Sequence, residues 1–91
     1  MTEKIILEVV TPERLVLREE VDDVLAPGSE GDFGVLPGHC EFLTMLRAGE
    51  LRYRIGEQVL SLEVRGGFAE VRANHIIILA DEAEKRLKDE G

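Results

Sequence analysis

Apolar and polar residues alternate with a period of two along most of this chain. The alternation, or a short apolar run that fits it, occurs in residues 5–10, 51–55, 59–64, 68–71 and 76–79. A period of two is typical of β-strands with one buried face. Turn-forming residues separate these segments about every ten residues, as they do in β-sandwiches and barrels. We therefore expect one all-β unit without linkers or internal repeats.

Two segments depart from simple alternation. Residues 16–26 mix apolar side chains with four carboxylates, which predicts one bent edge strand that uses charge to discourage pairing with other chains. From Asp81 onward the chain has good helix formers, an acidic first turn and opposite charges four residues apart. We expect a β-sandwich domain over residues 1–81 and a short helical or frayed tail over residues 82–91.

The segment from Gly28 to His39 contains four glycines, one proline and two carboxylates. This density of turn formers excludes a helix and predicts a shaped loop. At least one of its three large apolar side chains, Phe33, Val35 and Leu36, should pack in the core. Glu30 and Asp32 should be solvated, and they are either ordinary surface charges or a docking point for a basic or polar partner.

Length and charge narrow the class of protein. The chain has 91 residues, enough for one small domain, and its 19 acidic and 11 basic residues give a net charge of −8. This charge repels nucleic-acid phosphates and anionic lipids, so we expect no nucleic-acid partner. No apolar run approaches the roughly 20 residues that span a bilayer, which favours a soluble, cytoplasmic chain. The single cysteine excludes an internal disulfide.

Catalytic and metal-binding chemistry finds little support in the sequence. His39 and Cys40 are neighbours on an extended segment, so their side chains should point to opposite faces, and Cys40 is better explained as a small apolar residue. His39 and His75 lack His or Cys partners at ligand spacing. The Gly28-x-x-Gly31-x-x-Gly34 spacing matches neither a dinucleotide fingerprint nor a P-loop. We expect no catalytic, cofactor-binding or metal-binding residue and no small-molecule substrate.

Five sequence features occur together in one order. They are residues 28–39, Leu43-Thr44, Gly49, Gly66-Gly67-x-x-Glu70-Val71 and Leu79-Ala80-Asp81. With them the chain resembles the epsilon subunit of F-type ATP synthases over about Ile5 to Asp81. The resemblance implies a ten-stranded β-sandwich that serves as a non-catalytic rotor component. It also implies binding to the gamma subunit and the c-ring, and a peripheral place on the cytoplasmic face of the bacterial inner membrane.

The resemblance also implies roles for particular residues. Glu30, Asp32 and His39 match positions in the loop that faces the c-ring. Thr11, Thr44, Arg65 and Glu70 match positions on the gamma-facing side, although the family commonly has a small polar residue in place of Arg65. The family usually continues into a helical hairpin that inhibits ATP hydrolysis and in some members binds ATP. Because this chain stops at Gly91 and lacks that ATP motif, we expect neither property. A free-standing β-sandwich adaptor remains the alternative.

Overall fold

The computed structural model describes residues 3–38 and 41–85, and these residues form strands and turns without a helix. The strands are β1 (Ile5–Val10), β2 (Leu15–Val21), β3 (Asp23–Gly28), β4 (Gly31–Val35), β5 (Phe42–Met45), β6 (Gly49–Ile55), β7 (Gln58–Arg72) and β8 (His75–Lys85). The prediction of an all-β fold is confirmed, and the segments with a period of two lie in β1, β6, β7 and β8.

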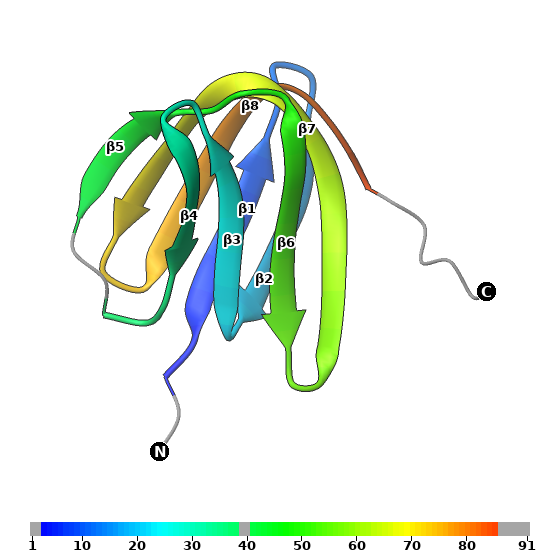
Figure 1. Ribbon diagram of the computed structural model, residues 1–91. Coiled ribbons are helices and arrows are strands. Elements are labelled where there is room, and N and C mark those ends of the chain that lie inside the picture. The colour runs from blue at the N-terminus through cyan, green and yellow to red at the C-terminus, as the bar shows by residue number, and fades with distance from the viewer. Residues whose placement is uncertain (1–2, 39–40, 86–91) are drawn as a thin grey trace.

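The strands form two packed layers joined by β7 and β8 (Figure 1). In the first layer, residues 67–72 of β7 pair with β5 and with residues 75–80 of β8, and β1 and β2 extend this layer beyond β8. In the second layer, residues 58–64 of β7 pair with β6, which is followed by β3 and β4. Residues 82–85 of β8 pair with the other side of β7 there. Each of the two long strands therefore contributes to both layers.

A bend at Gly66 and Gly67 carries β7 from one layer to the other. Both residues have positive φ angles, 71° and 106°, in the region that favours glycine. A Cβ atom on residue 67 would lie 1.9 Å from the carbonyl oxygen of Leu79 on β8. Only glycine fits this close approach of two backbones. The pair therefore bends a continuous strand instead of ending it.

The core lies between the two layers and is built from alternate residues of the strands. Six of its largest fully buried side chains are Leu7, Val9, Leu51, Leu62, Ile76 and Ile78. No polar or charged residue of the described chain is buried. Val35 is also buried, which confirms that at least one apolar side chain of the glycine-rich segment packs in the core. Phe33 is half-buried and makes an edge-to-face contact with Phe42, with ring centroids 5.3 Å apart.

The predicted count of ten strands is wrong for the described chain, which has eight. Residues 59–64 and 68–71, expected as separate strands, both belong to β7. Because β7 and β8 each cross the bend without interruption, their two halves lie in different layers but are not separate strands.

The predicted helix is wrong for residues 82–85, which continue β8. Their pairing with β7 places Lys85 opposite Leu62 and Ala83 opposite Val64, and Ala83 packs against the core. The ladder and this packing outweigh the helix propensity of a short segment that has no other apolar residue to bury. Residues 86–91 of the expected helix lie outside the described residues.

Two further expectations need correction. Residues 16–26 form parts of two strands, because the chain bends at Asp22 and passes from β2 in the first layer to β3 in the second. Only β2 is an edge strand, since β3 lies between β4 and β6. The glycine-rich segment contains strand β4 as well as turns, because Gly31 to Val35 pair with β3 as a hairpin.

Candidate protein-interaction face

Five apolar side chains lie in one line across the outer face of the first layer. The register pairs Met45 with Phe68, Phe68 with Leu79, Leu79 with Val10, and Val10 with Leu15. One residue from each of the five strands of this layer is therefore in direct cross-strand contact with the next. We call these five residues the apolar row.

The apolar row is open to solvent although its members are large. The exposed fractions are 57% for Met45, 44% for Phe68, 45% for Leu79 and 53% for Leu15, and Val10 is half-buried. Single exposed apolar residues are ordinary on protein surfaces, but a contiguous row usually marks an interaction site. Leu43, 68% exposed, lies two residues from Met45 on the same face of β5 and extends the apolar surface.

A hollow of about 410 Å³ adjoins the apolar row at the bend. Val10, Phe68 and Leu79 line it together with Gly67, which contributes no side chain. The turn between β1 and β2 forms its rim, and the Thr11 hydroxyl oxygen there accepts hydrogen bonds from the backbone N–H groups of Glu13 and Arg14, each at 3.3 Å. The hollow is open to solvent and continues the apolar surface of the row.

Charged pairs occupy the same face beyond the apolar row. Glu70 accepts two hydrogen bonds from the Arg72 guanidinium, at 2.9 and 2.7 Å. Glu8 lies 3.0 Å from the His75 ring and also forms an ion pair with Arg18. The hydrogen bond from His75, followed by the contact with Arg18, holds the pKa of Glu8 below its ordinary value. The face thus has an apolar half and a half of paired charges.

The turn between β3 and β4 lies next to the Met45 end of the apolar row. The backbone N–H of Ser29 donates to the Met45 carbonyl at 2.8 Å, which ties the turn to the end of β5. Glu30 is exposed at the tip of this turn. Asp32 is exposed as well and forms an ion pair with Arg47 from the loop between β5 and β6. The structure therefore brings Glu30 and Asp32 together at one edge of the apolar face.

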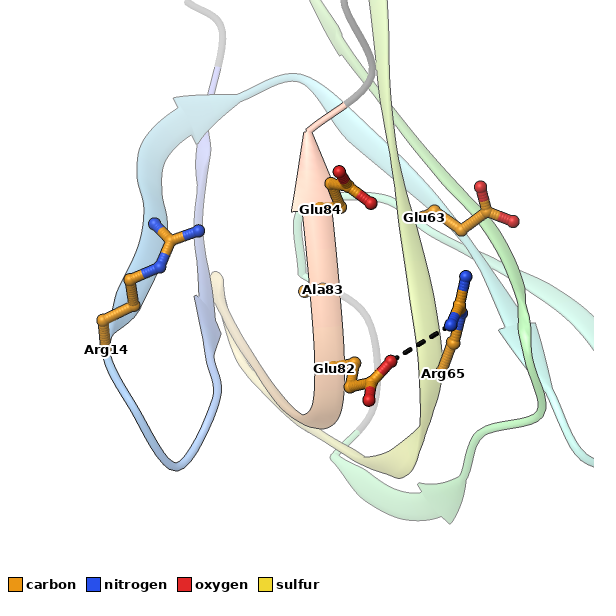
Figure 2. A pocket seen from close by; sticks show the side chains of 6 residues that line it. All are labelled: Arg14, Glu63, Arg65, Glu82, Ala83 and Glu84. Carbon is orange, nitrogen blue, oxygen red and sulfur yellow. Dashed lines mark hydrogen bonds and ion pairs between the residues drawn. The ribbon is translucent and has the colours of Figure 1, made fainter.

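The four residues expected on the gamma-facing side are in different environments. Thr11 is at the rim of the hollow, and Glu70 is on the outer face of β7, two residues from Phe68. Thr44 is half-buried on the inner side of β5, opposite the buried Ala69. Arg65 lies beyond the bend, where its Nη1 atom is 3.1 Å from Glu82 in a separate hollow (Figure 2). The structure brings Thr11 and Glu70 to the apolar face but not Arg65.

His39 and Cys40 lie outside the described residues. The preceding residue, Gly38, donates its backbone N–H to the Asn74 side-chain oxygen at 3.0 Å, at the turn between β7 and β8. This turn is at the opposite end of β4 from Glu30 (Figure 1). Residues 28–38 thus run from one end of the sandwich to the other.

Other kinds of site find little support in the described part of the chain. It contains no group of three or more metal-ligating side chains and no helix long and apolar enough to cross a membrane. The period of two identified the outward positions of each strand, but the apolar row was not predicted. Residues 45, 68, 79, 10 and 15 are neighbours only through long-range pairing, so the available signal was the presence of large apolar residues at outward positions.

Comparison with known proteins gives one consistent result. Residues 4–86 match the family described as the ATP synthase delta/epsilon chain, β-sandwich domain. The ATP synthase epsilon chain of Syntrophobacter fumaroxidans is 56% identical over 85 residues, which are 93% of this chain and 63% of that one. The epsilon chain of a Dehalococcoides mccartyi strain is 51% identical over 82 residues, 90% of this chain and 59% of that one.

Solved structures agree with the sequence matches. A chain of the Euglena gracilis mitochondrial ATP synthase, in a structure of OSCP, F1 and the c-ring, superposes with a TM-score of 0.86 at 28% identity, over 93% of this chain and 55% of that chain. A chain from the central stalk and c-ring of the Tetrahymena thermophila enzyme has a TM-score of 0.75 at 20% identity over 92% of this chain and 68% of that chain, which shows the shared fold. The chain spans about 60% of the length of the curated relatives it matches.

Proposed function

Because the chain belongs to the β-sandwich domain family of ATP synthase delta and epsilon chains, we propose that it is a non-catalytic rotor component of an F-type ATP synthase. In this role it joins the gamma subunit to the c-ring and couples proton translocation to ATP synthesis. It would lie peripherally at the cytoplasmic face of the bacterial inner membrane and be held there by the complex. No nucleotide, metal or small substrate enters this role.

The apolar row is the observation that carries the proposal. An isolated sandwich of this size has no structural need for a line of five apolar side chains of which four are exposed. A rotor component does need a surface that binds another subunit strongly enough for the two to rotate together. We assign the apolar row and its hollow to gamma, with Thr11 and Glu70 at the margin of the contact. Thr44 then supports the interface from beneath β5, and Arg65 lies outside its centre.

The turn that carries Glu30 and Asp32 suits a second contact, with the polar loops of the c-ring. Its carboxylates are exposed, and its backbone is tied to β5 beside Met45. Charged contacts of this kind fix orientation more than they add affinity. A rigid connection between this turn and the apolar row would carry torque from the ring to gamma. His39 is included in the proposed ring contact on the family resemblance alone.

Reconstitution of a synthase depleted of its epsilon subunit tests the proposal. Adding this chain should restore ATP-driven proton pumping in membrane vesicles, measured together with ATP hydrolysis so that coupling is separated from catalysis. A Glu57→Gln variant, altered at the exposed turn between β6 and β7, should restore pumping as well as the unmodified chain does. Unchanged pumping after addition of a folded chain would contradict the proposal and favour the alternative of an adaptor for some other partner.

A further inference from the structure

The outer edge of β8 is without a strand partner beyond the bend. β1 pairs with β8 only from His75 to Leu79, because the chain leaves the sheet at Thr11 and turns into β2. On that side, no strand of the described chain pairs with residues 82–85. Such an edge offers free backbone donors and acceptors to another extended segment.

The register shows which peptide groups point outward. Ile6 donates its backbone N–H to the Asn74 carbonyl at 3.0 Å, so even-numbered residues of this hairpin arm direct their peptide groups toward β1. Beyond the bend the β6–β7 hairpin sets the alternation: Ile55 and Gln58 close a two-residue turn as a hydrogen-bonded pair, so even-numbered residues of β7 there direct their peptide groups toward β6 and odd-numbered residues direct theirs toward β8. Glu82 and Glu84 pair with Arg65 and Glu63, so their peptide groups point toward β7, and those of Ala83 and Lys85 point away from it.

Two hollows flank this edge. One, of about 240 Å³, is lined by Arg14, Glu63, Arg65, Glu82, Ala83 and Glu84 (Figure 2). The other, of about 290 Å³, lies between the turn at residues 11–14 and residues 81–83 of β8. In Figure 2 the Arg14 side chain lies across an open space from β8. A strand of four residues, roughly 13 Å long at about 3.3 Å per residue, matches the length of residues 82–85.

The charge of this edge selects the kind of occupant. Glu82 and Glu84 line the first hollow and Glu13 and Asp81 line the second; Arg14 lines both and Arg65 is already paired with Glu82, so carboxylates outnumber cations at this edge. A second copy of this chain would bring the same carboxylates and a net charge of −8 to the edge. An extended segment with lysine or arginine at alternate positions would instead pair its charges with these carboxylates.

We infer that the outer edge of β8 at residues 82–85 binds an extended basic segment of a partner protein, which adds to the second layer as a further strand. Backbone hydrogen bonds to Ala83 and Lys85 supply register, and the side chains of Glu82 and Glu84 select basic residues. Residues 82–85 lie beyond the bend and belong to the other layer, so they are outside the apolar row, and the two surfaces adjoin at Thr11, Pro12 and Asp81.

The test uses a fluorescent peptide of alternating lysine and valine as the probe, with binding followed by anisotropy. The peptide should bind more weakly as salt rises, and a peptide of alternating glutamate and valine should not bind. Lys85→Pro removes an outward N–H but leaves the ladder to β7 intact, so it should weaken binding at least about tenfold without loss of the fold. Glu84→Lys should weaken it similarly through charge, whereas Glu57→Gln should have no effect.

Amide hydrogen exchange of the unmodified chain supplies a measurement that needs no variant. Bound peptide should slow exchange at Ala83 and Lys85 and leave the amides of β2 and β4 unchanged. Protection spread over the apolar row, or binding that survives both Lys85→Pro and Glu84→Lys, would overturn the inference. Dimerisation of the chain through β8, seen as peptide-independent protection at higher protein concentration, would also overturn it.

Discussion

Gly67 and Leu79 lie so close across the β7–β8 ladder that a Cβ atom on residue 67 would be 1.9 Å from the Leu79 carbonyl oxygen. Gly67 also has a φ of 106°, which residues with a side chain rarely adopt. Gly67→Ala should therefore lower the free energy of unfolding by more than about 3 kcal/mol, since both the clash and the backbone strain must be relieved. Urea denaturation followed by circular dichroism measures this loss.

Gly34→Ala is the matched control for that substitution. Gly34 lies in β4, where an added Cβ atom would have its nearest neighbour at 3.8 Å. The same change of residue should alter the free energy of unfolding there by less than about 1 kcal/mol. Equal losses at both positions would contradict the assignment of Gly67 as the bend on which the two layers depend.

Asp22 connects three parts of one end of the sandwich. Its carboxylate accepts a hydrogen bond from the Lys4 ammonium at 2.6 Å and another from the backbone N–H of Gly56 at 2.7 Å. The Lys4 contact first, and the Gly56 contact second, hold the pKa of Asp22 below its ordinary value of 3.8. Asp22→Asn, which keeps the shape and removes the charge, should lower the melting temperature near about pH 7.

The pH dependence of this effect has a definite sign. A carboxyl whose pKa is lowered by folding stabilises the protein above its unfolded pKa, and the stabilisation disappears as pH falls through the folded pKa. The difference in melting temperature between the two proteins should therefore shrink as pH is lowered from about 6 to about 3. The paired comparison removes the contribution of Glu8, which is common to both. A difference that stays constant with pH would assign the effect of Asp22→Asn to shape instead of charge.

Asp32 should contribute little to stability, because its ion pair with Arg47 joins two side chains that are each about half exposed. We expect Asp32→Arg to reduce the free energy of unfolding by less than about 1 kcal/mol. Under the proposed function, the same variant should reduce ATP-driven proton pumping in the reconstituted synthase. Asp32→Asn, which keeps the shape without reversing the charge, should have a smaller effect. A large loss of stability with Asp32→Arg would show that the turn is a structural element and not a docking point.

The strands could be predicted from the sequence because each has one buried face, and its apolar and polar residues therefore alternate with a local period of two. β1 and β6, for example, lie close to where Ile5 to Val10 and Leu51 to Ile55 alternate. Features that depend on neighbouring strands could not be predicted in this way. Gly66-Gly67 is compatible with a turn or a bend, and residues 82–85 favour a helix until β7 is beside them. The pairing of β7 with β8 makes Gly66-Gly67 a bend and residues 82–85 part of a strand.

The same distinction applies to the candidate site. Glu30 and Asp32 were predicted as exposed because glycines and serine around them indicate a turn, and that information is local. The apolar row depends on register instead, since Val10 and Leu79 become neighbours only when β1 joins β8 in parallel. Nothing within either strand specifies that pairing.

The affinity of this chain for purified gamma subunit, with Phe68→Glu as the test variant, examines the central claim most directly. Phe68 is exposed in the middle part of the apolar row, so a glutamate there should leave the fold intact and weaken binding by about 100-fold. Val59→Glu is the control, because Val59 is 57% exposed on the outer face of the second layer. The account predicts a large loss for Phe68→Glu and no change for Val59→Glu in titration calorimetry. Equal affinities for the two variants, or an absence of binding by the unmodified chain, would contradict it.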